Sequence, residues 1–142
     1  MSKGNTAEND VINLVFNATL AAHLGTLSGT GNANLYVALH TGDPGEAGSQ
    51  TTSECAFGSY ARQAVARSGA GWTVSGNSAE NAATISFPEC TSGSETVTHV
   101  SIGTIVSGAG QIIYSGALNA SRSVSSGITL QFAAGSLVVT ED

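Results

Sequence analysis

Basic residues are scarce in this chain: four Lys and Arg stand against ten Asp and Glu among 142 residues, giving a formal net charge of −6. Because proteins that grip phosphates cluster Lys and Arg, direct nucleic-acid binding is not expected. The apolar runs fall far short of the ~20 residues that cross a bilayer, so no membrane association is expected. The sequence also lacks the pattern of a secretory signal, which is a basic start followed by an apolar segment and a small-residue cleavage site. Synthesis in the cytoplasm without export is therefore expected.

Cysteine and proline occur only twice each. Cys55 and Cys90 lie far apart without CxxC spacing, which predicts two ordinary buried or half-buried thiols rather than a disulfide or a metal site. The histidines stand singly, at His23, His40 and His99, without the short spacings typical of metal ligands. We therefore expect no metal and no cofactor.

The first 25 residues differ from the rest of the chain. Apolar side chains recur there at a helical period, at Val11, Leu14, Val15, Ala18 and Ala22. Asn5 and Glu8 form a capping-box pattern, and Gly25 supplies a stop signal. The sequence therefore predicts an amphipathic helix and arm over residues 1–25.

The opposite side of this helix is also partly apolar, since it carries Ile12 and Phe16. Two interpretations are open. The extra apolar surface docks on the protein's own sheet, or it docks on a neighbouring subunit.

From residue 34 to residue 140, short β-prone runs alternate with turns rich in Gly, Ser and Asn, and eighteen glycines occur in the chain. We expect a mainly β fold, an antiparallel β-sandwich or jelly roll with an N-terminal α-helix, in a single domain over residues 1–142. The candidate segments for about six to eight strands are 35–40, 59–66, 72–75, 83–87, 96–102, 111–115, 121–125, 128–132 and 136–140.

Catalytic chemistry finds little support in the sequence. His40 and Asp43 flank a glycine-rich turn where a dyad could sit, but no Gly-x-Ser-x-Gly elbow accompanies them. We expect Asp43 to cap the turn and His40 to be a half-buried strand-end residue. Acids fall in predicted loops, where they are interpreted as solubilising: Glu46, Glu54, Glu80, Glu89 and Glu95. The protein is predicted not to be an enzyme.

Four side chains are candidates for an interface between subunits: Tyr60, Arg62, Phe16 and Ile12. Tyr and Arg are favoured in buried contacts between proteins, and the alternative for Arg62 is an exposed pair with a loop acid. Arg62 and Arg67 are expected on one strand, facing opposite sides. Trp72, the largest apolar side chain, is predicted to fill the core.

Six segments carry a family resemblance that spans most of the chain: residues 35–44 (LYVALHT with Asp43 and Pro44), 58–62 (GSYAR), 85–88 (ISFP), 98–103 (THVSIG), 114–118 (YSGAL) and 132–137 (FAAGSL). In this order they resemble small tailed-bacteriophage virion structural proteins, which include capsid cement or decoration proteins and are often labelled tail or tail-fibre proteins. No catalytic motif accompanies the resemblance.

The resemblance leaves the place in the virion open. The small β domain, the turn-rich, low-charge surface and the amphipathic terminal helix favour a cement protein on the outer capsid surface, with the major capsid protein as its partner and with self-association as a homodimer or homotrimer. A tail, baseplate or fibre component is the alternative. A glycan-binding module that stacks sugars on Trp72, Tyr36, Tyr60 or Tyr114 is a further alternative.

Overall fold

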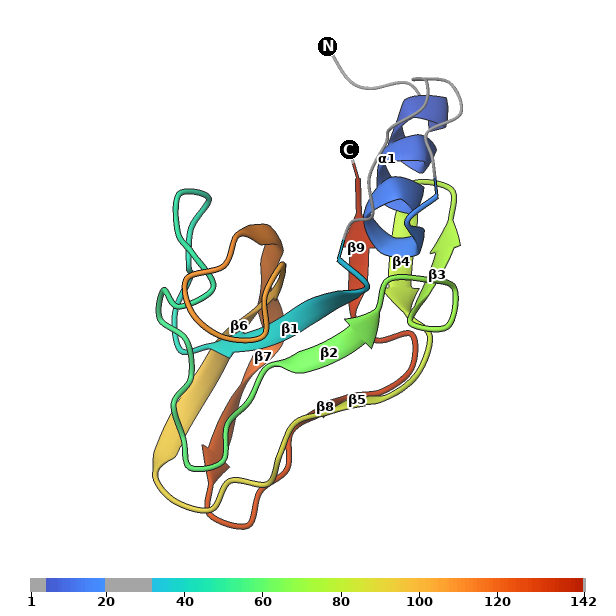
Figure 1. Ribbon diagram of the computed structural model, residues 1–142. Helices are drawn as coiled ribbons and strands as arrows, with labels where there is room; N and C mark the ends of the chain where they lie inside the picture. The colour runs from blue at the N-terminus through green and yellow to red at the C-terminus, as the bar shows by residue number, and fades with distance from the viewer. Residues whose placement is uncertain (1–4, 20–31, 142) are drawn as a thin grey trace. The chain divides into compact units, whose positions relative to one another are not determined.

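The computed structural model describes residues 5–19 and 32–141. One helix and nine strands follow one another in this part of the chain: α1 (Asn5–Asn17), β1 (Asn34–His40), β2 (Gln63–Ala66), β3 (Trp72–Ser75), β4 (Ser78–Asn81), β5 (Ile85–Ser86), β6 (Ser94–Gly103), β7 (Ile112–Ser125), β8 (Gln131–Phe132) and β9 (Val138–Thr140) (Figure 1). The strands form sheets in the orders β2-β1-β6-β7, β3-β4-β9 and β5-β8. The predicted mainly β fold with an N-terminal helix is confirmed, and the jelly-roll arrangement stays a prediction.

The protein divides into two compact units that interleave along the sequence. Unit 1 uses the described parts of Met1–Asn34, Val65–Ile85 and Phe132–Asp142, and unit 2 uses Leu35–Ala64 and Ser86–Gln131. The N-terminal helix is thus grouped with later strands. That residues 1–142 form a single domain, with a helix and arm over residues 1–25, stays a prediction.

In unit 1, α1 packs against β3 and β4. Its buried residues are Glu8, Ile12 and Phe16, spaced four apart on one face. The Phe16 ring meets Trp72 edge to face with 4.6 Å between centroids, and both side chains are 0% exposed. Trp72 therefore fills the core as predicted. Ile12 and Phe16 dock on the protein's own sheet, and the expected inward face through Val11, Leu14 and Val15 is wrong, since those residues are only half-buried.

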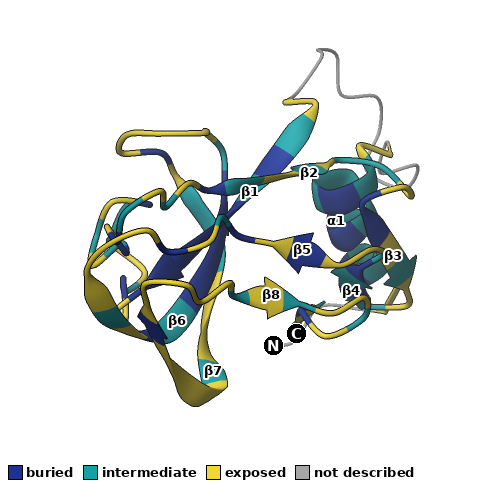
Figure 2. Cartoon of the chain, turned by 90° about the horizontal axis from the view of Figure 1, so that it is seen from below, coloured by how far each residue is buried: buried dark blue, intermediate teal, exposed yellow. Residues whose placement is uncertain are grey.

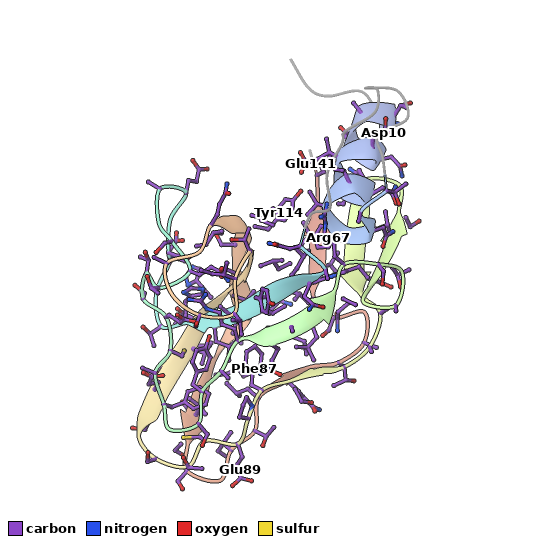
Figure 3. The ribbon with its side chains drawn as sticks, in the orientation of Figure 1. Asp10, Arg67, Phe87, Glu89, Tyr114 and Glu141 are labelled. Carbon is purple, nitrogen blue, oxygen red and sulfur yellow. The ribbon has the colours of Figure 1, made fainter. Side chains whose placement is uncertain are left out.

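The helix ends earlier than predicted. Ala18 adopts a left-handed φ of 52°, and the Thr19 N–H donates to the Asn13 carbonyl at 3.2 Å. The Arg67 guanidinium donates to the Val15 carbonyl at 2.6 Å and to the Leu14 carbonyl (Figure 3). A cation here satisfies helix carbonyls and opposes the negative end of the helix dipole. The predicted stop at Gly25 lies outside the described residues.

The polar strand β4 was not predicted. It pairs antiparallel with β3 and β9, and its Asn81 is 1% exposed. The Asn81 amide donates to the Ala83 and Ala133 carbonyls at 2.8 Å each and accepts from the Leu137 N–H at 2.8 Å. One buried side chain thus joins distant segments of unit 1.

Unit 2 is built on the antiparallel pairs β1–β6 and β6–β7. Its buried apolar side chains come from these strands and adjoining loops: Leu35, Val37, Leu39, Phe57, Phe87, Val97, Val100, Ile102 and Val124. β7 is mostly exposed (Figure 2). Its register to β6 shifts between Val97 and His99, which leaves residues 118–121 without a cross-strand partner and explains why two strands, 111–115 and 121–125, were predicted here.

The predicted strand 59–66 is shorter than expected, because β2 begins at Gln63. Ser59 has a left-handed φ of 71°, which a strand does not accommodate. Arg62 therefore precedes β2 and Arg67 follows it, so the prediction that both lie on one strand is wrong. None of the described helices has the length and apolarity that crossing a bilayer requires.

Candidate functional site

Two loops of unit 2 come together at one end of its sheet. Residues 41–62 connect β1 to β2, and residues 104–111 connect β6 to β7. They are joined by an isolated antiparallel bridge between Ser49 and Gln111 and by a 2.9 Å hydrogen bond from the Gln50 N–H to the Gly110 carbonyl. Figure 1 draws them beside each other, in teal to green and in orange. Backbone contacts therefore tie the two loops together.

A buried ion pair holds the two loops. Arg62 Nε and Nη2 donate to the Glu54 carboxylate oxygens at 2.6 and 2.7 Å, and the two side chains are 2% and 15% exposed. The same guanidinium donates to the carbonyls of Ile105 at 3.0 Å and Gly108 at 2.8 Å. A planar bidentate guanidinium suits this geometry because its donors are fixed in a fork. Arg62 thus fastens loop 104–111 to Glu54.

Tyr60 extends this arrangement. Its hydroxyl donates to Glu54 Oε1 at 3.1 Å and accepts from the Leu39 N–H at 3.0 Å. Phe57 packs edge to face on the ring, and Phe87 stacks parallel to it. Burial raises the pKa of Tyr60 well above its usual range, with the Glu54 charge acting in the same direction. The phenol therefore stays neutral and keeps its proton for Glu54.

Gln50 fixes the loop from the other side. It is 0% exposed, and its Oε1 accepts the N–H groups of Thr104 and Ile105 at 3.0 and 3.1 Å. A Cβ at Gly103 or Gly110 would meet the Gln50 side chain at 2.2 or 2.3 Å, so both glycines are required for this contact. Gln50, Glu54, Tyr60 and Arg62 together form what we call the anchoring cluster.

The four predicted interface residues thus have defined places. Tyr60 and Arg62 belong to the anchoring cluster of unit 2, whereas Ile12 and Phe16 lie in the core of unit 1. Whether any of them also contacts another subunit stays a prediction. The interpretation of Glu54 and Glu95 as solubilising is wrong, because Glu54 pairs with Arg62 and the Glu95 carboxylate accepts the Ala56 N–H at 3.0 and 3.1 Å.

The suspected dyad of His40 and Asp43 is not assembled. Asp43 accepts the Gly45 N–H at 2.9 Å and caps the turn, as predicted. His40 is 0% exposed rather than half-buried. Its Nδ1 lies 2.9 Å from the Thr52 carbonyl oxygen, which only accepts, so Nδ1 carries the proton and Nε2 accepts from the Ser101 hydroxyl at 2.7 Å. Ser101 is 1% exposed, so both partners are closed to solvent.

The burial of His40 predicts that its contribution to the unfolding free energy is lost in acid. Burial lowers its pKa below 6.5; the Thr52 hydrogen bond and Glu54 raise it, while Arg62 and His99 lower it. The unfolded chain binds a proton at pH values where the folded chain does not, so this stability is complete above pH 6.5 and declines as pH falls below it. We expect His40→Gln to flatten the decline in unfolding free energy just below pH 6.5, measured by urea titration.

The comparison is made between slopes against pH, because a general loss caused by replacing a buried side chain lowers the unfolding free energy at every pH and leaves the slope unchanged. Equal slopes for wild type and His40→Gln would contradict the assignment.

Both cysteines are free and buried, in line with the expectation of ordinary thiols. Burial, reinforced by the nearby Glu95 carboxylate, raises the pKa of Cys55 to about 12, and the Cys90 thiol donates to the Ser92 carbonyl at 3.3 Å. Because the thiolate is the reactive form, the native protein should resist a thiol-specific disulfide reagent, and both cysteines should react after denaturation. Rapid colour development from the native protein would contradict this prediction.

Within the described ranges, no group of three or more His, Cys, Asp or Glu side chains is arranged to hold an ion. What the geometry does provide is a mainly β scaffold whose buried polar side chains fix the shape of a surface loop.

Comparison with known proteins identifies the lineage of this scaffold. The chain matches the family described as Podophage GP4 fiber I protein gp80 over residues 2–140. It therefore belongs to this family, and the prediction of a bacteriophage virion structural protein is confirmed at that level. No curated protein matches the chain.

Proposed function

We propose that this protein is a structural subunit of a podophage tail fibre and that it works by contact with other virion subunits, without catalysis. The observation that carries the proposal is the family match over residues 2–140, whose description names a fibre protein. That match favours the fibre, which was the alternative in the sequence analysis, over capsid cement.

The chemistry of unit 2 supports a contact role. The side chains of the anchoring cluster make hydrogen bonds that hold the two loops in position. His40 and Ser101, which resemble a base and a nucleophile, are both closed to solvent. A rigid surface loop with an apolar tip suits subunit packing. Under this proposal, the protein's partners are further copies of itself and other tail proteins.

Location in the particle tests the proposal. Purified virions would be separated into emptied heads and tails, and the protein would be quantified in each fraction by mass spectrometry beside the major capsid protein. A fibre subunit is expected in the tail fraction at a few to some tens of copies, because fibres follow the symmetry of the tail. Copy numbers near that of the major capsid protein, recovered with the heads, would overturn the fibre proposal in favour of cement.

A further inference from the structure

His40, the last residue of β1, connects the sheet of unit 2 to loop 41–62. It is 0% exposed, and its ring Nδ1 donates to the Thr52 carbonyl of the loop at 2.9 Å. Beside the ring, an isolated antiparallel bridge pairs His40 with Glu54, and the Cys55 N–H donates at 2.9 Å to the β1 carbonyl that precedes His40. This part of the loop therefore lies against the ring and is held partly by it.

The contacts of His40 suit its neutral form. Nε2 carries no proton and accepts from the Ser101 hydroxyl at 2.7 Å. A proton on Nε2 would make this nitrogen a donor, and the hydroxyl proton of Ser101, which is 1% exposed, would lose its acceptor. The ring would also carry a charge away from water, which is costly in a protein interior. Movement of segment 49–55 away from the ring removes both costs, because water then solvates the imidazolium.

The charged groups around His40 leave this preference in place. Burial is the largest influence and lowers the pKa of His40 below 6.5. From the loop, the Thr52 carbonyl and Glu54 raise this pKa, and Arg62 lowers it. From β6, His99 also lowers it, and the loop between β6 and β7 contains no charged side chain. Opening of the segment that lies against the ring therefore takes up a proton as pH falls below 6.5.

We infer that His40 is an acid-operated latch, whose protonation frees segment 49–55 from β1 and thereby loosens loop 104–111, while the β6–β7 ladder stays paired. Segment 49–55 contains Gln50 and Glu54, which hold loop 104–111 directly and through the ion pair of the anchoring cluster. The β6–β7 ladder does not include this segment. Each opening takes up one proton, so the open population should rise by up to tenfold for each pH unit below 6.5. The latch is a property of the chain itself and goes beyond the proposed function.

Thiol labelling of the wild-type chain tests the latch. Cys55 lies in the segment that opens and Cys90 lies outside it, and both are free and buried in unit 2. A dipyridyl disulfide labels thiols in acid as well as at neutral pH, and peptide mapping by mass spectrometry gives the rate at each site relative to the urea-unfolded chain at the same pH. At about pH 5, Cys55 should react roughly tenfold or more faster than Cys90, and roughly tenfold or more faster than it does itself at about pH 7. Equal relative rates at the two cysteines would show that acid unfolds the whole unit and would overturn the inference.

The variant His40→Gln identifies the group that takes up the proton. Its relative rate at Cys55 should be nearly the same at about pH 5 and about pH 7, since a general loss of stability raises the rate at both pH values alike. A rise in acid as large as that of wild type would overturn the inference. Hydrogen exchange of the wild-type chain gives a measurement that needs no variant. The Gln50 amide, bonded to the Gly110 carbonyl at 2.9 Å, should lose protection in acid together with the faster labelling of Cys55, and protection that persists would overturn the inference.

Discussion

Replacing Arg62 with methionine is expected to cost about 3–5 kcal/mol of unfolding free energy, because one partner of a buried pair is removed and the other is left uncompensated. The Glu54 carboxylate loses both guanidinium donors and keeps only the Tyr60 hydroxyl, and the carbonyls of Ile105 and Gly108 lose the donor that Arg62 supplies. Urea denaturation followed by far-ultraviolet circular dichroism measures the loss. The melting temperature should fall by roughly 10 °C or more.

Arg122→Met is the matched control, because Arg122 is exposed on β7 and the same substitution there should change stability by less than about 0.5 kcal/mol. A double variant with Arg62→Met and Glu54→Gln should lose less than the sum of the single losses, since it removes the stranded charge together with its partner. If the two losses of unfolding free energy simply added, or if Arg62→Met were as stable as the control, the residues of the anchoring cluster would not be energetically coupled.

Truncating Trp72 to alanine is expected to cost about 3–5 kcal/mol, the usual range for a fully buried aromatic side chain. Trp72 is 0% exposed and meets Phe16 of α1, so the cavity would open between the helix and its sheet. The measurement is the urea concentration at which the helical part of the circular dichroism spectrum is lost, which should be lower than in wild type. No other tryptophan occurs in the chain, so fluorescence cannot follow this variant.

Two comparisons make the Trp72 result specific. Trp72→Phe should lose much less, because it keeps most of the ring and removes a buried Nε1–H that has no hydrogen-bond partner in the described part of the chain. Val138→Ala, at an exposed valine of β9, should stay within about 0.5 kcal/mol of wild type. A Trp72→Ala chain as stable as Val138→Ala would contradict the packing described for α1.

Strands with apolar alternation were predictable from the sequence, and β3 was predicted with its observed bounds. Strand β4 was not, because its sequence, Ser-Ala-Glu-Asn, carries no apolar pattern. It is a strand because β3 and β9 pair with it on both sides and because Asn81 finds its partners in distant loops. Such partners exist only in the folded chain.

The buried face of α1 was also not predictable from the sequence. Periodicity favoured Val11, Leu14 and Val15, yet the face through Ile12 and Phe16 is the buried one. The helix is apolar around much of its circumference, so the choice depends on what lies opposite. Here that partner is Trp72, some fifty-five residues further along the chain.

The candidate site was predictable only in part. The residue types of Tyr60 and Arg62 favour buried contacts, whereas nothing in the sequence distinguishes Glu54 and Gln50, which complete the cluster, from ordinary loop residues. Their roles arise from loop closure between residues 41–62 and 104–111, which local patterns do not encode. Position in the virion is equally outside what a fold predicts, since one fold serves many assemblies.

The interleaving of the two units has a consequence for synthesis on the ribosome, which delivers residues in order. All of unit 2 has been translated once Gln131 is made, whereas unit 1 lacks β9, the pairing partner of β4, until Val138–Thr140 follow. Among the described elements α1 is made first, yet it belongs to the unit that needs β9. Nascent chains therefore carry Ile12 and Phe16 until β9 has been made, and that interval is when a chaperone would meet them.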